Sequence, residues 1–124
     1  MVYHLLGDYE KAMDILYQAQ KIPGYYAFAS SLLGGLHVTM KQTEKAQEYL
    51  EKLLTEKEIL PGQQVSFHLS YLYAALDQPD KMFHYLNKSI EAKDNYILYI
   101  LGYPNINKFH ADPRYSEIIR KIGL

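Results

Sequence analysis

The chain contains no cysteine and no tryptophan among its 124 residues, and it carries no excess of basic charge. Without cysteine there is no disulfide bond, no thiolate metal site and no cysteine nucleophile. Thirteen Lys and Arg residues are balanced by fourteen Asp and Glu residues, for a net charge of −1. This balance argues against an electrostatic nucleic-acid binder and against a polybasic membrane-surface protein.

Long apolar runs are also missing. No segment approaches the roughly 18 apolar residues that a transmembrane helix needs. The apolar stretch at the start of the chain is too short for a secretory signal, because the charged residue Asp8 follows soon after Leu5 and Leu6. The sequence therefore predicts a soluble protein that has no membrane partner and no nucleic-acid partner. The location that we expect for it is the cytoplasm, although the missing signal does not by itself establish this.

What the chain does contain is an internal repeat. The tripeptide Glu-Lys-Ala at 10–12 recurs at 44–46, 34 positions later, and becomes Asp-Lys-Met at 80–82, 36 positions further on. A Leu follows four residues after each tripeptide, at positions 16, 50 and 86. A period of this length is typical of stacked helical repeats.

Each repeated unit is predicted to contain two helices. Apolar residues recur at i, i+3, i+4 and i+7 spacing in the first helix of the second and third units. The second helices are expected over residues 8–21, 43–58 and 79–92, with Thr43 as an N-cap and Pro79 in the first turn. Because no alternating strand pattern accompanies these periods, the sequence predicts an all-α fold.

Small and apolar positions keep one register in the second and third units. In the second unit they are Ser30, Leu33, Gly34, His37, Ala46 and Leu50. In the third unit they are Ser66, Leu69, Ser70, Tyr73, Met82 and Leu86. On these positions the chain resembles the tetratricopeptide repeat family over roughly residues 1–93, although Ser30 and Ser66 replace the usual Trp. The resemblance implies a short right-handed α-α superhelix.

The expected organisation is a single tetratricopeptide-like domain over residues 1–124. It is divided into a half repeat (1–22), a repeat (25–58), a second repeat (61–93) and a capping tail (94–124). Helix signals agree within the tail, since Asp112 is suited to cap a helix, Pro113 to open it and Gly123 to follow it. We therefore expect a capping helix that closes the open end of the repeats.

The ending from Asp112 to Leu124 is similar to the last helix of tetratricopeptide regions in certain bacterial signalling proteins. These include adenylate-cyclase-like proteins and multidomain transcriptional regulators, in which the repeats follow a catalytic or DNA-binding domain. The resemblance implies the regulatory or sensory C-terminal part of a larger protein. The incomplete first unit agrees with truncation from a longer chain; alternatively, Val2, Leu5 and Leu6 form an apolar end through which two copies dimerise.

Patterns for catalysis and metal binding are weak. The five His residues are scattered without a His-x3-His pair, and no Gly-rich phosphate loop is present, so we expect no metal and no cofactor. A remote alternative is a small enzyme that uses His68 and Tyr71, one helical turn apart. We expect the chain not to be an enzyme.

Thirteen tyrosines are the strongest compositional bias. We expect most of them to fill space between helices, while the alternative is that a few line a ligand groove. In the family that the chain resembles, the first helices line the concave face. The corresponding groove positions are Phe28, Ser31, Leu32, Gly35, Val38, Gln64, Phe67, His68, Tyr71 and Ala74.

None of these ten residues is Lys, Arg or Asn, so the groove lacks the donors with which chaperone-binding relatives hold a C-terminal carboxylate. The sequence therefore predicts a protein–protein interaction module whose partner is an apolar peptide segment, bound as a helix or as an extended strand. Two alternatives remain open. In the first, the chain is a structural homo-oligomerisation unit without a separate ligand. In the second, the groove is filled by the chain's own tail or by a second copy.

Overall fold

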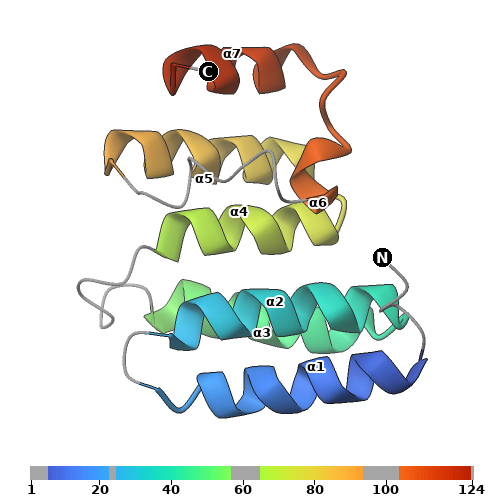
Figure 1. Ribbon diagram of the computed structural model, residues 1–124. Helices are drawn as coiled ribbons and strands as arrows, with labels where there is room; N and C mark the ends of the chain where they lie inside the picture. The colour runs from blue at the N-terminus through green and yellow to red at the C-terminus, as the bar shows by residue number, and fades with distance from the viewer. Residues whose placement is uncertain (1–5, 23–24, 57–64, 94–103, 124) are drawn as a thin grey trace. The chain divides into compact units, whose positions relative to one another are not determined.

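A computed structural model describes residues 6–22, 25–56, 65–93 and 104–123. Within these residues the chain forms seven helices and no strand (Figure 1), so the prediction of an all-α fold is confirmed. The chain divides into two compact units, Met1–Gln63 and Gln64–Leu124. The first part of the expected capping tail, residues 94–103, lies outside the described residues.

The first unit contains α1 (Leu6–Ala19), α2 (Tyr26–Thr39) and α3 (Thr43–Glu56). Helix α2 contacts both α1 and α3. Because it is covered from two sides, α2 carries small and apolar residues around most of its circumference, and Ala27, Ala29 and Leu33 are fully buried. The middle helix is therefore the core of this unit.

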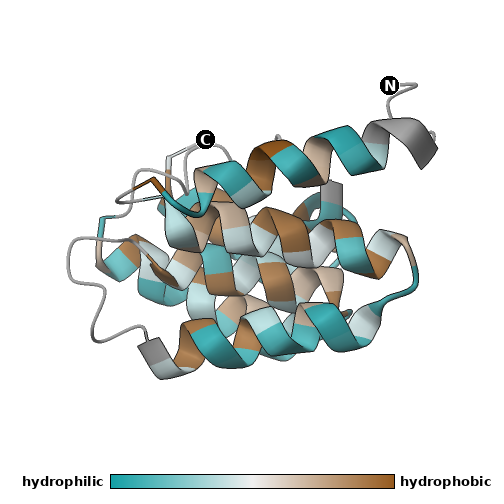
Figure 2. Ribbon diagram, turned by 90° about the horizontal axis from the view of Figure 1, so that it is seen from below, coloured by the Kyte–Doolittle hydropathy of each residue, from teal (hydrophilic) through white to brown (hydrophobic). Residues whose placement is uncertain are grey.

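Helix α3 has one buried stripe and one charged face. Ala46, Leu50 and Leu53, at i, i+4 and i+7, are all fully buried, while Glu44 and Glu51 are exposed. This separation is the pattern of a helix that packs on one side only. Figure 2 shows the same alternation of hydrophobic and hydrophilic residues along the helices.

The second unit contains α4 (Val65–Ala75), α5 (Pro79–Glu91), α6 (Pro104–Asn107) and α7 (Pro113–Lys121). Helix α4 contacts α5 and α6, and α5 also contacts α7. The fully buried stripe of α5 is Met82, Leu86 and Ser89, and each of these lies 36 positions after its counterpart on α3. The register that the sequence predicted is thus the register of the buried cores.

The turns that follow α2 and α4 have the same backbone. Lys41 and Asp77, 36 positions apart, both have a left-handed φ, of 62° and 61°. One residue later, the Gln42 N–H donates to the His37 carbonyl at 2.7 Å and the Gln78 N–H donates to the Tyr73 carbonyl at 2.9 Å. A left-handed residue after a helix satisfies the last carbonyls in this way and reverses the chain.

The helix starts agree only in part with the sequence signals. Pro79 lies in the first turn of α5, as predicted. Thr43 is already the first residue of α3, and the Lys45 N–H donates to the carbonyl of Gln42, so the prediction of Thr43 as an N-cap is wrong. A Ser or Thr one position inside a helix gives the same sequence signal as a cap, because helix ends are poorly fixed by sequence.

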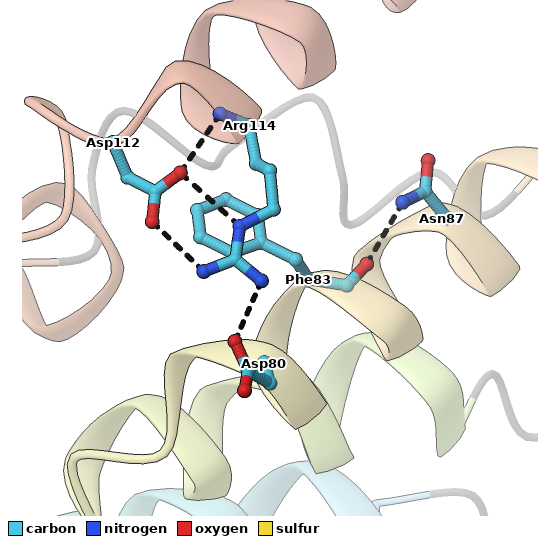
Figure 3. A network of polar contacts seen from close by, with 5 residues as sticks. All are labelled: Asp80, Phe83, Asn87, Asp112 and Arg114. Carbon is cyan, nitrogen blue, oxygen red and sulfur yellow. Dashed lines mark hydrogen bonds and ion pairs between the residues drawn. The ribbon is translucent and has the colours of Figure 1, made fainter.

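Helix α7 begins and ends where its sequence signals predict. The Asp112 carboxylate accepts a hydrogen bond from the Arg114 backbone N–H at 2.9 Å, and Gly123 follows the helix with φ of 83°. The Arg114 guanidinium donates to Asp80 at the start of α5 and lies 4.7 Å from the ring centroid of Phe83 (Figure 3). These contacts attach α7 to α5.

Candidate functional site

The predicted groove positions of the first unit share one face of α2. Phe28, Leu32 and Val38 are partly exposed, whereas Ser31 and Gly35 are buried. The Ser31 hydroxyl donates to the carbonyl of Phe28 at 2.8 Å and is therefore engaged within its own helix. The part of this face that can meet a partner is apolar, and we call Phe28, Leu32 and Val38 the α2 face.

The predicted positions of the second unit lie on α4 and are more deeply buried. Phe67, His68 and Ala74 are at most 4% exposed, and Tyr71 is partly exposed. The Tyr71 hydroxyl accepts a hydrogen bond from the Asn105 side chain at 3.2 Å. Gln64 lies outside the described residues. A groove that combines the α2 and α4 positions stays a prediction.

Burial sets the chemistry of His68. Its ring meets Phe67 edge-on, with ring centroids 6.1 Å apart, and desolvation lowers its pKa from 6.5 to about 4. The imidazole is therefore neutral near pH 7. A base with so low a pKa is a weak proton acceptor, which gives no support to the alternative of an enzyme built on His68 and Tyr71.

A metal centre finds no support either. Within the part of the chain that the structure describes, no group of three or more His, Asp or Glu side chains is placed to hold a metal ion. Nor is any helix there both long and apolar enough to cross a membrane.

Tyrosines from three helices line a hollow in the first unit. It has a volume of about 290 Å³ and receives side chains from α1, from the residue that follows α1, from α2 and from α3. We call it the tyrosine pocket, and its lining residues are Tyr17, Gln20, Tyr26, Lys45, Glu48, Tyr49 and Lys52. A second hollow, of about 490 Å³, adjoins it at Lys45 and Glu48 and is lined only by polar and charged residues of 41–48.

The tyrosines of the pocket interact with one another. Burial raises the pKa of Tyr49 to about 12, and the nearby hydroxyls of Tyr17 and Tyr26 add to the rise. The Tyr49 ring stacks on His37, with ring centroids 5.9 Å apart. The Lys52 ammonium lies 5.2 Å from the centroid of the Tyr26 ring, a cation–π distance. All of these groups belong to the first unit.

Sequence reasoning left the role of individual tyrosines open. Tyr17, Tyr26 and Tyr49 are separated by 9 and 23 positions, which no helical period connects. Only the packing of α1, α2 and α3 brings them to one place. On α3 itself a signal was present, because Lys45, Tyr49 and Lys52 share a face at i, i+4 and i+7.

The first unit also carries exposed apolar side chains. Ile15, Ile22 and Tyr25 are 66%, 50% and 48% exposed, and all lie on α1 or between α1 and α2. The predicted dimer contact used Val2 and Leu5, which lie outside the described residues, and Leu6, whose side chain is not described.

Comparison with known families gives a match in three stretches. A sequence profile described as Tetratricopeptide repeat matches residues 1–24, 29–58 and 64–96, which together make up more than half of the chain. No curated protein and no solved structure matches the chain.

Proposed function

The chain belongs to the tetratricopeptide repeat family, and from this premise we propose that it binds an apolar segment of a partner protein on the α2 face. Repeats of this family are generally protein–protein interaction modules, and their fold is a non-enzymatic scaffold. The observation that carries the proposal is the row of partly exposed apolar side chains on α2, at Phe28, Leu32 and Val38. In the second unit Tyr71, 36 positions after Gly35, is the described groove position on α4 that is partly exposed.

The binding energy would come from burial of apolar surface. Removing a side chain of the size of Leu or Phe from water contributes about 1.5–3 kcal/mol. Three such side chains without a charged neighbour in the row favour a partner that presents apolar residues from one face of a helix or from an extended strand. The chain itself is proposed to have no catalytic activity and to need no cofactor.

The broader setting is proposed from the ending of the chain. Residues 112–124 resemble the end of regulatory regions in bacterial signalling proteins, which favours a regulatory or sensory part of a larger cytoplasmic protein. Sequencing of the reading frame upstream of Met1 tests this. A catalytic or DNA-binding domain there would support the regulatory role, and an unrelated region would contradict it.

The binding proposal is tested with selected peptides. A random peptide library is panned on the immobilised chain, and the affinity of the best binder is measured by calorimetry. We expect Leu32→Glu to weaken this binding at least tenfold, because it places a charge in the apolar row. Ile15→Glu is the matched control, since Ile15 is also exposed but lies on α1. Equal affinity of the wild type and Leu32→Glu for the peptide, with both folded, would exclude the α2 face as the binding site.

Self-association is a second candidate function, and the exposed side chains of Ile15, Ile22 and Tyr25 favour it. Exposed apolar side chains often form contacts between chains. Sedimentation equilibrium distinguishes this function. A dimer that is lost in Ile15→Glu/Ile22→Glu would support it, whereas a monomer at every concentration would exclude it.

A further inference from the structure

The tyrosine pocket has the size of a small ligand. Its volume is about 290 Å³, and a cavity of about 150 Å³ is enough to hold a benzene molecule. The pocket therefore has room for one aromatic ring with a substituent.

Its walls offer ring faces. Tyr17 is 40% exposed, and Tyr26 and Tyr49 are partly exposed, so each has surface available to a ligand. The stack of Tyr49 on His37 holds the Tyr49 ring in one orientation. Aromatic rings prefer to pack on other rings in offset or edge-to-face arrangements, and each such contact adds about 0.5–1.5 kcal/mol.

The charge of the lining is positive. Lys45, Glu48 and Lys52 lie on one face of α3 and all are exposed, which gives two ammonium groups against one carboxylate. Lys52 is placed over the ring of Tyr26, so positive charge and ring face occur together. Burial raises the pKa of Tyr49, so its hydroxyl is protonated near pH 7 and adds a neutral hydrogen-bond donor. Such a lining attracts a group that accepts hydrogen bonds and carries negative charge.

We propose that the tyrosine pocket binds an aromatic ring that carries an anionic group, at a site separate from the α2 face. The ring lies between the tyrosines, and the anionic group is held by Lys45 and Lys52. This chemistry can come from a free aromatic acid or from the C-terminal aromatic residue of a polypeptide. The proposal does not depend on the peptide-binding function, because its residues are not those of the α2 face.

The test uses 4-hydroxybenzoate as the probe and two-dimensional NMR of the full chain labelled on nitrogen and on tyrosine ring carbons. We expect saturable shifts at Tyr17, Tyr26 and Tyr49. The neutral analogue 4-hydroxybenzamide should bind at least fivefold more weakly, because it lacks the charge. Comparable affinity of the two probes would overturn the anionic part of the proposal.

A matched pair of variants locates the charge. Lys45→Gln/Lys52→Gln removes the two ammonium groups of the pocket and keeps most of each side chain. Lys81→Gln/Lys88→Gln is the control, because these exposed lysines occupy the same positions on α5, 36 residues later. We expect the first variant to weaken binding of 4-hydroxybenzoate at least tenfold and the second to leave it within twofold.

A third variant tests the ring contact without touching charge. Tyr17→Ala removes an exposed wall of the pocket, so it should weaken the binding of 4-hydroxybenzoate. Circular dichroism should show an unchanged helical content. Absence of shifts at the pocket tyrosines at 10 mM probe, or equal weakening by both lysine pairs, would overturn the site. A peptide that ends in Tyr identifies the source: tighter binding than the free acid indicates a chain terminus, and weaker binding indicates a small molecule.

Discussion

Arg114 of α7 lies 34 positions after Asp80 of α5, the residue to which its guanidinium is bound at 2.8 Å. The same separation divides Pro113 from Pro79, the residues that open these two helices. Two further hydrogen bonds span 34 positions, from Lys121 to Asn87 and from Asn105 to Tyr71. Since 34 is also the spacing between the first two repeats, the helices α6 and α7 continue the repeat spacing into the tail.

The first prediction concerns the attachment of α7. Arg114→Ala should lower the thermal midpoint, because Arg114 bonds Asp80 and Asp112 and covers the ring of Phe83. Arg114→Lys should have a thermal midpoint close to that of Arg114→Ala. An ammonium group cannot reproduce the planar, forked hydrogen bonding of the guanidinium or its stacking on the ring. The control is Arg120→Ala, because Arg120 pairs only with Glu117 of its own helix among the contacts of the described residues. Equal midpoints for the two alanine variants would contradict this role.

The second prediction concerns the shared core register. Leu50 and Leu86, 36 positions apart, are both fully buried. Each substitution to Ala should lower the free energy of unfolding by about 2–5 kcal/mol through lost burial and a residual cavity. Ile15→Ala, at an exposed position, should change it by less than about 0.5 kcal/mol. Urea denaturation measures all three, and a Leu50→Ala change as small as that of Ile15→Ala would place the register in doubt.

The third prediction uses the left-handed turn. Lys41 has φ of 62°, a conformation that strains a residue with a Cβ atom. Lys41→Gly should therefore raise the free energy of unfolding by up to about 1 kcal/mol, despite the extra freedom that Gly gives the unfolded chain. Glu51→Gly, in the exposed middle of α3, should lower it by about 1 kcal/mol. A loss of stability in both variants would show that the turn is not strained.

The fourth prediction is a pH dependence. The pKa of His68 is about 4 in the folded chain and near 6.5 when unfolded. Between these values the unfolded chain binds a proton that the folded chain does not. The contribution of His68 to the free energy of unfolding is therefore fully present above pH 6.5 and is lost as the pH falls toward 4. The loss from this group amounts to about 3 kcal/mol.

Two measurements check this dependence. NMR titration of the His68 ring should give a pKa near 4, and a value near 6.5 would contradict its burial. Denaturation at pH 7 and pH 4.5 should show a smaller difference in stability for His68→Gln than for the wild type, because only the wild type carries the buried imidazole.

Much of the fold could be predicted from the sequence because it depends on local periodicity. The second helices were expected at 8–21, 43–58 and 79–92, and the structure places α1, α3 and α5 at 6–19, 43–56 and 79–91. The repeated Leu positions were visible in the sequence, and two of them, Leu50 and Leu86, belong to the buried stripes of α3 and α5. Helix ends such as Thr43 were less certain because side-chain capping depends on geometry.

The candidate site was less accessible to sequence reasoning. The family pattern assigned Phe67 and His68 to the groove, but the structure shows both side chains buried. The pattern does not say which positions of α4 remain exposed once α5 and α6 pack against this helix. The tyrosine pocket depends on the packing of three helices, so the separations of Tyr17, Tyr26 and Tyr49 in sequence do not reveal it. Local pattern predicts the elements, and their packing decides which side chains meet a ligand.

The central claim is that the α2 face binds an apolar segment of a partner protein. The most direct measurement is a set of intermolecular nuclear Overhauser effects between the labelled chain and its best selected peptide. The account predicts contacts from apolar side chains of the peptide to Phe28, Leu32 and Val38. Contacts confined to α1 and α3, with none to these three residues, would contradict it.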